Sequence, residues 1–274
     1  MDSVFSDSAF DAKRVAAEFV RARRSAGSFE NYPGPLPLDL DAAYRCQDEA
    51  IALWGDDIAG WKVGWIPEPL SEKFGAQRLV GPIFSGGLHR ANGSASVRVP
   101  VFARGFAAIE AEFVFQMARD APANVVDWTA ETARRFVTGM FAGIEIASSP
   151  LQNINDYGPA VVASDFGNNA GLLLGAEVSD WTHRNLELLH CETRIDGVVV
   201  GSGNAATVSG GPLAALAFAL RCNARRGRPL RAGEYVTTGA TTGVHSIAAG
   251  QSAEVLFAGI GSLRCVAVPM TPVA

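Results

Sequence analysis

The spacing of apolar and polar residues in the first part of the chain predicts two amphipathic helices. Residues 7–26 place their apolar side chains near one stripe and their charged side chains outside it. The second helix is expected over residues 41–54, where Asp39 or Asp41 can cap its first turn. A proline-rich connection joins the two segments. We therefore expect residues 1–57 to form a small N-terminal helical cap.

The pattern changes at residue 58, where short apolar runs bounded by glycine and proline begin. Such runs are typical of strands. The aspartate and glycine at 196–197 predict a tight hairpin turn between two of them. Helices are expected at residues 70–74, 129–138 and 212–226. The predicted fold class is therefore α+β, with a β-rich core over residues 58–274.

Two glutamates interrupt the predicted strand over residues 106–117. Alternate side chains of a strand share a face, so Glu110 and Glu112 are expected to point the same way. The remaining residues of that face are mostly apolar. A Glu-x-Glu pair on a strand is often a solvated edge, and that interpretation stays open for the pair alone.

A third glutamate, Glu145, is the one charged residue in the apolar run 139–147. Ionised carboxylates in apolar surroundings cost free energy unless a cation or hydrogen-bond donors compensate them. A hard divalent metal is the simplest compensation, because carboxylates supply oxygen ligands and leave positions open for water or substrate. The candidate metal ligands are Glu110, Glu112 and Glu145.

Two further segments contain candidate chemistry. Lys62 lies among apolar residues and glycines in the predicted strand 58–65. A lysine in a strand is usually an exposed edge residue, but the neighbouring glycines allow close backbone approach, so Lys62 could instead reach into a cleft. The turn at residues 238–243 lacks the lysine and helix of a P-loop, yet its backbone amides could hold a carboxylate.

Composition excludes several classes of protein. Hydrophobic residues make up 48% of the 274 positions, but no apolar run approaches the roughly 20 residues of a membrane helix. The net charge of -5 and the scattered basic residues argue against a nucleic-acid partner. The first seven residues lack the basic start and apolar block of a secretory signal, so a cytoplasmic location is expected. The four cysteines are widely spaced, which predicts reduced core residues.

A small basic cluster, Arg21, Arg23 and Arg24, lies near the end of the first predicted helix. Basic side chains are common in the last turn of a helix, where they interact favourably with the helix dipole. We interpret this cluster as the solvated end of a helix and not as a phosphate site.

Seven short motifs, taken in order, resemble the fumarylacetoacetate hydrolase superfamily. Within it, the chain is most similar to the branch of 2-keto-4-pentenoate hydratases and 4-oxalocrotonate decarboxylases. Each motif is weak alone, and the signal comes from their order. The matching stretches are residues 60–64, 109–112, 143–146, 201–203, 211–216, 233–240 and 259–262.

The resemblance implies roles for individual residues. Lys62 matches the active-site lysine of the family, and the turn at Thr238 and Gly239 matches a segment that lines the substrate pocket. The resemblance also implies a mixed β-roll core, a homo-oligomer and a divalent metal, Mg²⁺ or Mn²⁺. The residues that match the metal ligands of the family are Glu110, Glu112 and Glu145.

The chain departs from the family at two places. The hydratases of the family have an aspartate just before a glycine after the lysine strand, whereas this chain has Leu79-Val80-Gly81. That aspartate is linked to the active-site water. Bulky residues, Trp65-Ile66-Pro67, also replace the smaller hydroxyl-bearing residues usual after the lysine. We therefore expect a pocket mouth that accepts a different or more apolar substrate.

The leading hypothesis is a metal-dependent hydratase that adds water to a 2-hydroxy-2,4-dienoate, in the breakdown of aromatic compounds. Lys62 is the candidate for proton transfer or for holding the water. Decarboxylation of a 2-oxo-dioate is the first alternative, because the same site would serve it. Hydrolysis of an acylpyruvate is the second, but the cap lacks the necessary histidine, since the first histidine is His89. A non-catalytic binding protein is the third.

Overall fold

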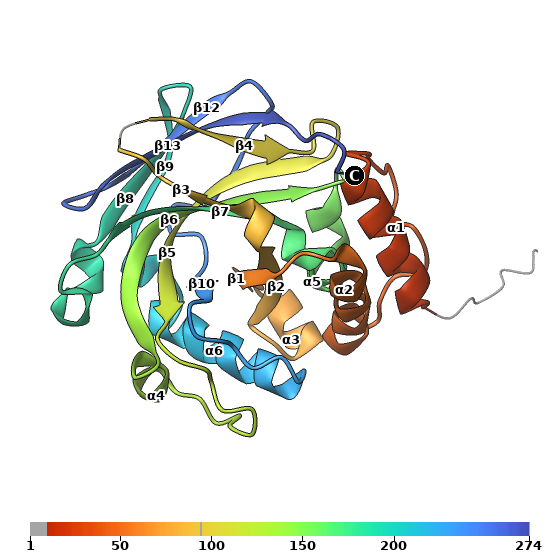
Figure 1. Cartoon of the computed structure of the whole chain (residues 1–274), viewed down its shortest axis with the longest axis horizontal. Helices are drawn as coiled ribbons and strands as arrows, with labels where there is room; N and C mark the ends of the chain where they lie inside the picture. Colours follow the sequence, from red (N-terminus) through yellow and green to blue (C-terminus); the bar gives the residue numbers. More distant parts are fainter. Residues whose placement is uncertain (1–9, 94, 274) are drawn as a thin grey trace, which may run out of the picture.

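Strands form the centre of the molecule, and helices cover its outside (Figure 1). The computed structural model describes residues 10–93 and 95–273. Within these residues the α-helices are α1 (Ala12–Arg24), α2 (Leu40–Trp54), α3 (Leu70–Phe74), α4 (Ala130–Arg134), α5 (Pro159–Ser164) and α6 (Pro212–Arg225). The predicted α+β class is confirmed.

The larger of two sheets contains Lys62 and the three candidate metal ligands. Its strands are β1 (Ile58–Trp65), β2 (Arg78–Phe84), β3 (Leu88–Arg90), β5 (Phe106–Met117), β6 (Val137–Ser149), β7 (Asn169–Glu177), β10 (Tyr235–Thr237) and β11 (Val244–Ser246). Their order is β2-β1-β10-β5-β6-β7-β3, and β11 pairs with β5. Figure 1 shows that the long strands β5, β6 and β7 curl strongly across the molecule.

The smaller sheet packs over one face of this curl (Figure 1). Its strands are β4 (Val97–Val101), β8 (His190–Ile195), β9 (Val198–Asn204), β12 (Ser252–Phe257) and β13 (Gly261–Pro269), in the order β4-β13-β12-β8-β9. Phe113 of β5 meets Phe257 of β12 edge to face, with ring centroids 5.6 Å apart. Burial of such apolar side chains from both sheets forms the main core.

The helical cap follows the predicted capping signals. The Asp39 side chain accepts a hydrogen bond from the backbone of Ala42 and caps α2, which ends at the left-handed Gly55. Asp11 caps α1 in the same way. The expected start of the first helix, near residue 7, lies outside the described residues. Helices α1, α2 and α5 pack together on one side of the sheet (Figure 1). The division of the chain at residue 58 stays a prediction.

Other local predictions have mixed outcomes. Asp196 and Gly197 both have positive φ, at 48° and 81°, as the predicted hairpin turn between β8 and β9 requires. The helix expected at 129–138 is much shorter, because the chain from Val137 onward pairs with β5 instead. Tertiary pairing overrides the local helical pattern there. Among the described residues, no helix is long and apolar enough to cross a membrane.

The pairing of β10 determines where the candidate residues meet. This short strand joins β1 to β5, but it pairs only with Gly60 and Trp61 on one side and with residues 114–116 on the other. Beyond Thr237 the chain leaves the sheet. The later part of β1, including Lys62, and the middle of β5 are therefore close without being bridged by hydrogen bonds.

Candidate active site

The structure brings the three predicted metal ligands together. Glu110 of β5 lies directly opposite Glu145 of β6, and Glu112 lies opposite Gly143 on the same strand pair. One carboxylate oxygen from each glutamate lies within 4.8 Å of the others. Glu110 is 7% exposed, and the other two glutamates are fully buried. The interpretation of the Glu-x-Glu pair as a solvated strand edge is therefore wrong.

Lys62 extends into this cluster. Its Nζ lies 3.2 Å from Oε1 of Glu145 and donates a hydrogen bond of 3.4 Å to Oδ1 of Asn168. The strand of Lys62 is internal, between β2 and β10, and the lysine is 4% exposed. The interpretation of Lys62 as an exposed edge residue is excluded. The side chain reaches into the interior, as the neighbouring glycines allow.

Protein donors hold only part of each carboxylate. Glu112 accepts a hydrogen bond of 2.5 Å at Oε2 from the backbone amide of Gly239, and Glu145 accepts one of 3.1 Å at Oε1 from Nδ2 of Asn169. The other oxygens, Oε1 of Glu112 and Oε2 of Glu145, are buried and have no hydrogen-bond partner among residues 10–93 and 95–273. Buried carboxylate oxygens without donors are costly. A divalent cation bound by oxygen ligands fits this arrangement.

Like charges dominate the cluster, since three carboxylates face one ammonium group. Burial raises the pKa of Glu110 from 4.5 to about 7, the charge of Glu145 adds to this, and Lys62 opposes it. Burial and the two neighbouring glutamates raise the pKa of Glu112 well above its ordinary value. For Lys62, burial lowers the pKa, but the three carboxylates outweigh burial and raise it. The lysine therefore carries a proton at neutral pH.

A pocket of about 300 Å³ opens beside these groups. Its polar lining comes from Lys62, Glu110, Asn155 and Asn168. The apolar lining residues are Trp65, Ile66, Pro67, Leu70, Leu79, Pro159, Val162 and Val244. The segment after the lysine thus contributes to the pocket wall, as expected from the two departures in the sequence.

A larger cavity, of about 650 Å³, lies elsewhere, between the cap and the sheet. Its lining includes Trp54, Phe102 and His89, but neither Lys62 nor any of the three glutamates. Its volume exceeds that of the pocket beside the glutamates. We place the candidate substrate site in the smaller pocket, because Lys62 and Glu110 line it.

Thr238 and Gly239 form a turn next to the carboxylate of Glu112. The Thr238 hydroxyl is buried and donates to the backbone oxygen of Phe113 at 2.7 Å. Gly239 has a φ of 109°, which favours glycine, and its amide binds Glu112. The carboxylate held by this turn is thus one from the protein itself. Neither residue lines the 300 Å³ pocket, and their role in substrate binding stays a prediction.

Sequence reasoning missed the two asparagines that contact the charged groups. Asn168 and Asn169 lie in a segment that reads as an ordinary polar turn before an apolar strand. Their side chains are buried at 5% and 4% exposure. Two adjacent asparagines at the start of an apolar strand could have indicated these contacts, since buried amide side chains need hydrogen-bond partners.

The interpretation of Arg23 as part of a solvated helix end is wrong. Its side chain is 5% exposed and forms an ion pair with the buried Asp165. Arg21 is exposed, as expected. The partner of Arg23 is 142 residues away in the chain, so no local pattern indicates the pair.

The fold and the site together define an α+β protein with a buried cluster of three carboxylates that could hold a divalent metal. Comparison with known proteins identifies its family. Residues 77–268 match the family model described as fumarylacetoacetate (FAA) hydrolase C-terminal. This match covers more than half of the chain, so the chain belongs to that family. The matched range includes the three glutamates but not Lys62.

Named relatives are enzymes that act on small molecules. The chain is 25% identical over 264 residues to the TodF product hydratase of Pseudomonas putida, covering 94% of this chain and 92% of the relative. It is 26% identical over 234 residues to the 2-keto-4-pentenoate hydratase of Paraburkholderia xenovorans, covering 83% of each. These relatives support an enzyme of this branch and confirm the resemblance.

Solved structures confirm the fold. The 4-oxalocrotonate decarboxylase from Pseudomonas putida G7, complexed with magnesium and adipate, aligns with a TM-score of 0.76 at 20% identity, covering 94% of this chain and 97% of that chain. A fumarylpyruvate hydrolase from Pseudomonas aeruginosa, in complex with Mn²⁺ and pyruvate, aligns with a TM-score of 0.55 at 16% identity, covering 76% and 88%. Relatives of this fold thus contain divalent metals.

The raised pKa of Glu110 predicts a pH dependence of stability in chelator-treated protein. Between about pH 4.5 and 7 the folded state holds a proton on Glu110 that the unfolded state has lost. The stabilising contribution of protonated Glu110 to the free energy of unfolding is therefore fully present below pH 4.5, and it is lost as the pH rises through about 7. Urea denaturation across this range measures the effect.

Glu110→Gln is expected to flatten this dependence, because the amide does not titrate. Glu254→Gln is the matched control, since Glu254 forms a partly exposed pair with Arg264 on the other sheet. Equal pH dependence in the wild type and in Glu110→Gln would contradict the electrostatic description of the cluster.

Proposed function

We propose that the protein is a divalent-metal-dependent hydratase that adds water to a 2-hydroxy-2,4-dienoate and forms a 4-hydroxy-2-oxo acid. The observation that carries this proposal is the group of three buried carboxylates beside Lys62 and a largely apolar pocket. Two of the carboxylates have an oxygen without a hydrogen-bond partner among the described residues. The names of the relatives in the hydratase branch support the same reaction.

The residues present suit Mg²⁺ or Mn²⁺. Glu110, Glu112 and Glu145 would hold the ion through carboxylate oxygens, which are the ligands that these hard cations prefer. A cation held there supplies positive charge that stabilises negative charge on the carboxylate and 2-oxygen of a 2-oxo acid. Gly239 and Asn169 fix the orientation of two of the glutamates by hydrogen bonds. In this proposal Thr238 and Gly239 serve substrate binding indirectly, by placing Glu112.

Lys62 is the proposed proton donor. Its Nζ lies 3.2 Å from Glu145, and the side chain lines the pocket together with Glu110. A protonated amine donates a proton or a hydrogen bond and does not act as a base. We therefore assign Lys62 to protonation of the dienol at its far carbon, C5, and the neutral amine that results takes up the proton that the 2-hydroxyl loses as the enol becomes a ketone. Water then adds across the C3–C4 double bond of the conjugated 2-oxo acid, with its oxygen on C4 and a proton on C3.

The apolar wall of the pocket favours hydration over decarboxylation of a dioate. Of the described residues that line the pocket, Lys62 is the one basic side chain. The second carboxylate of a dioate would therefore lie against apolar lining side chains such as Trp65 and Leu79; the nearby Arg78 packs on Trp65 but does not line the pocket. Burying an uncompensated carboxylate in this way is costly. A substrate with an apolar far end fits the pocket better.

Hydrolysis of an acylpyruvate and a non-catalytic binding role have weaker support. The hydrolysis needs a histidine paired with an acid, and no histidine is among the described residues that line this pocket. His89 lines the larger cavity instead. A non-catalytic binding protein would leave the buried, partly unpartnered carboxylates and Lys62 without a purpose. The cytoplasmic location and the homo-oligomer remain predictions.

The choice of reaction is tested with two substrates. With Mg²⁺ present, we expect loss of the ultraviolet absorbance of freshly generated 2-hydroxypenta-2,4-dienoate, and no release of CO₂ from a 2-oxohexenedioate. Treatment with a chelator should abolish the first reaction, and added Mg²⁺ or Mn²⁺ should restore it. Release of CO₂ from the dioate, without hydration of the dienoate, would make the protein a decarboxylase and overturn the proposal.

Removal of the lysine tests the proposed proton donor. Lys62→Met is expected to lower kcat by about 10²- to 10⁴-fold, the usual range for a lost acid or base. Mn²⁺ binding should persist, because the three carboxylates remain. Lys73→Met, which changes an exposed lysine, is the matched control. An unchanged kcat in Lys62→Met would remove the lysine from the mechanism.

A further inference from the structure

Three consecutive residues before β7 adopt left-handed backbone conformations. The φ angles are 54° for Phe166, 65° for Gly167 and 56° for Asn168. For residues other than glycine this conformation is uncommon and costs free energy. Such a turn persists only where surrounding groups hold it in place, and these turns are often found at functional sites.

The turn lies directly against the candidate active site. A Cβ atom added to Gly167 would lie 3.1 Å from Cδ of Lys62, and one added to Gly81 of β2 would overlap the backbone oxygen of Phe166. The next two side chains then contact the charged groups, Asn168 through Lys62 and Asn169 through Glu145. The conformation of the turn therefore determines where both amides lie.

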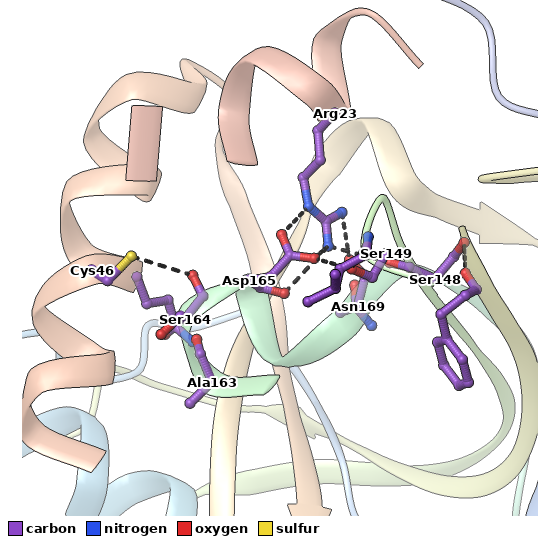
Figure 2. A network of polar contacts seen from close by, with 11 residues as sticks. Arg23, Cys46, Ser148, Ser149, Ala163, Ser164, Asp165 and Asn169 are labelled. Carbon is purple, nitrogen blue, oxygen red and sulfur yellow. Dashed lines mark hydrogen bonds and ion pairs between the residues drawn. The ribbon is translucent and has the colours of Figure 1, made fainter. Parts of the chain in front are cut away.

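Arg23, in the last turn of α1, contacts the residues on both sides of this turn, Asp165 and Asn169 (Figure 2). Its Nε lies 2.5 Å from Oδ1 of Asp165, and its Nη2 donates to Oδ2 of Asp165 at 2.9 Å. The same guanidinium donates to the backbone oxygen of Asn169 at 3.0 Å and to that of Ser148 at 3.2 Å. Figure 2 shows these groups converging on one guanidinium.

The contacts of Arg23 join three segments that meet at the site. Ser148 lies in β6, the strand that contains Glu145, and Asn169 begins β7. Ser149 also donates to Oδ2 of Asp165 at 2.6 Å, so Asp165 is held from both sides. The guanidinium in addition lies over the ring of Phe166, 4.9 Å from its centroid. Arg23 thus contacts Asp165, Phe166 and Asn169 around the base of the turn.

We propose that Arg23 is a positioning residue of the metal centre. It acts through Asp165 and the left-handed turn to place the Asn169 amide on Glu145 and the Asn168 amide on Lys62. The inference rests on the proposed function to the extent that Glu145 binds a metal. A buried ion pair is by itself weak evidence of a stabilising role, since apolar residues of similar size can replace it at little cost. Replacing both partners of the pair by uncharged residues should therefore change the position of the turn while leaving most of the stability.

The test uses a variant that removes both charges at once. Arg23→Met alone leaves Asp165 buried and unpaired, so it should be strongly destabilised. The double variant Arg23→Met/Asp165→Asn has no unpaired charge, keeps an acceptor for Ser149, and should recover most of the stability in urea denaturation. Arg21→Met is the matched control, because Arg21 lies on the same helix in an exposed pair with Glu18.

Two readouts follow the site without requiring turnover. In titration calorimetry of chelator-treated protein with Mn²⁺ alone, the double variant should bind about 10- to 100-fold more weakly, the usual effect of losing a group that orients a metal ligand. In hydrogen exchange, its amides over residues 166–170 should exchange faster than those of the wild type. Arg21→Met should match the wild type in both.

Wild-type Mn²⁺ affinity and unchanged exchange in a stable double variant would overturn the positioning role and leave the pair a structural one. If the wild type itself bound no Mn²⁺, the metal in the proposed function would be wrong, and exchange over residues 166–170 would still decide the role of Arg23. If the double variant did not fold, Arg23→Lys would replace it, because lysine keeps the charge but cannot make the two-pronged contact with Asp165. The same two readouts apply to that variant.

Discussion

Three carboxylates buried side by side in the middle of a sheet are the constraint on which the rest of the site depends. Glu110, Glu112 and Glu145 lie on two paired strands with their oxygens within 4.8 Å of one another. Their mutual repulsion and loss of hydration disfavour ionisation, as the raised pKa values of Glu110 and Glu112 show. Lys62, Gly239 and Asn169 compensate only part of this cost. A divalent cation would compensate the remainder.

The sheet provides the geometry for this compensation. Because β10 ends at Thr237, the chain leaves the sheet there, and the amide of Gly239 turns toward Glu112. Lys62 approaches from β1, and the turn before β7 packs against it and adds two asparagines, Asn168 on Lys62 and Asn169 on Glu145. The pocket thus combines a strongly polar inner group with an apolar wall. In the proposed function, this combination would bind a 2-oxo acid whose far end is uncharged.

Much of the site could be predicted from the sequence, because the alternation of side chains along a strand depends only on neighbouring residues. Alternation places Glu110 and Glu112 on one face, and the isolated charge of Glu145 marks a second apolar strand. For Lys62 two interpretations stay open at this level, since a strand alone does not show whether it lies at the edge of a sheet. The order of the motifs then indicates the family, which the comparison confirmed.

The features that the sequence did not reveal depend on contacts between distant segments. Arg23 resembles any basic residue in the last turn of a helix, and only the fold places Asp165 beside it. The helix expected at 129–138 ends early, at Arg134, for the same reason, since the pairing of Val137 and the following residues with β5 is not visible locally. The left-handed turn before Asn169 includes a phenylalanine and an asparagine, so composition did not indicate it. Long-range packing, which a single sequence does not contain, determined each of these features.

Binding of a divalent cation to the three glutamates tests the central claim most directly. Titration calorimetry of chelator-treated wild-type protein with Mn²⁺ should show one site per chain. Glu112→Gln, which keeps the size of the side chain and removes its charge, should bind far more weakly while remaining folded. Equal Mn²⁺ affinity in the wild type and in Glu112→Gln, or no binding to the wild type, would contradict the assignment of a metal centre to these carboxylates.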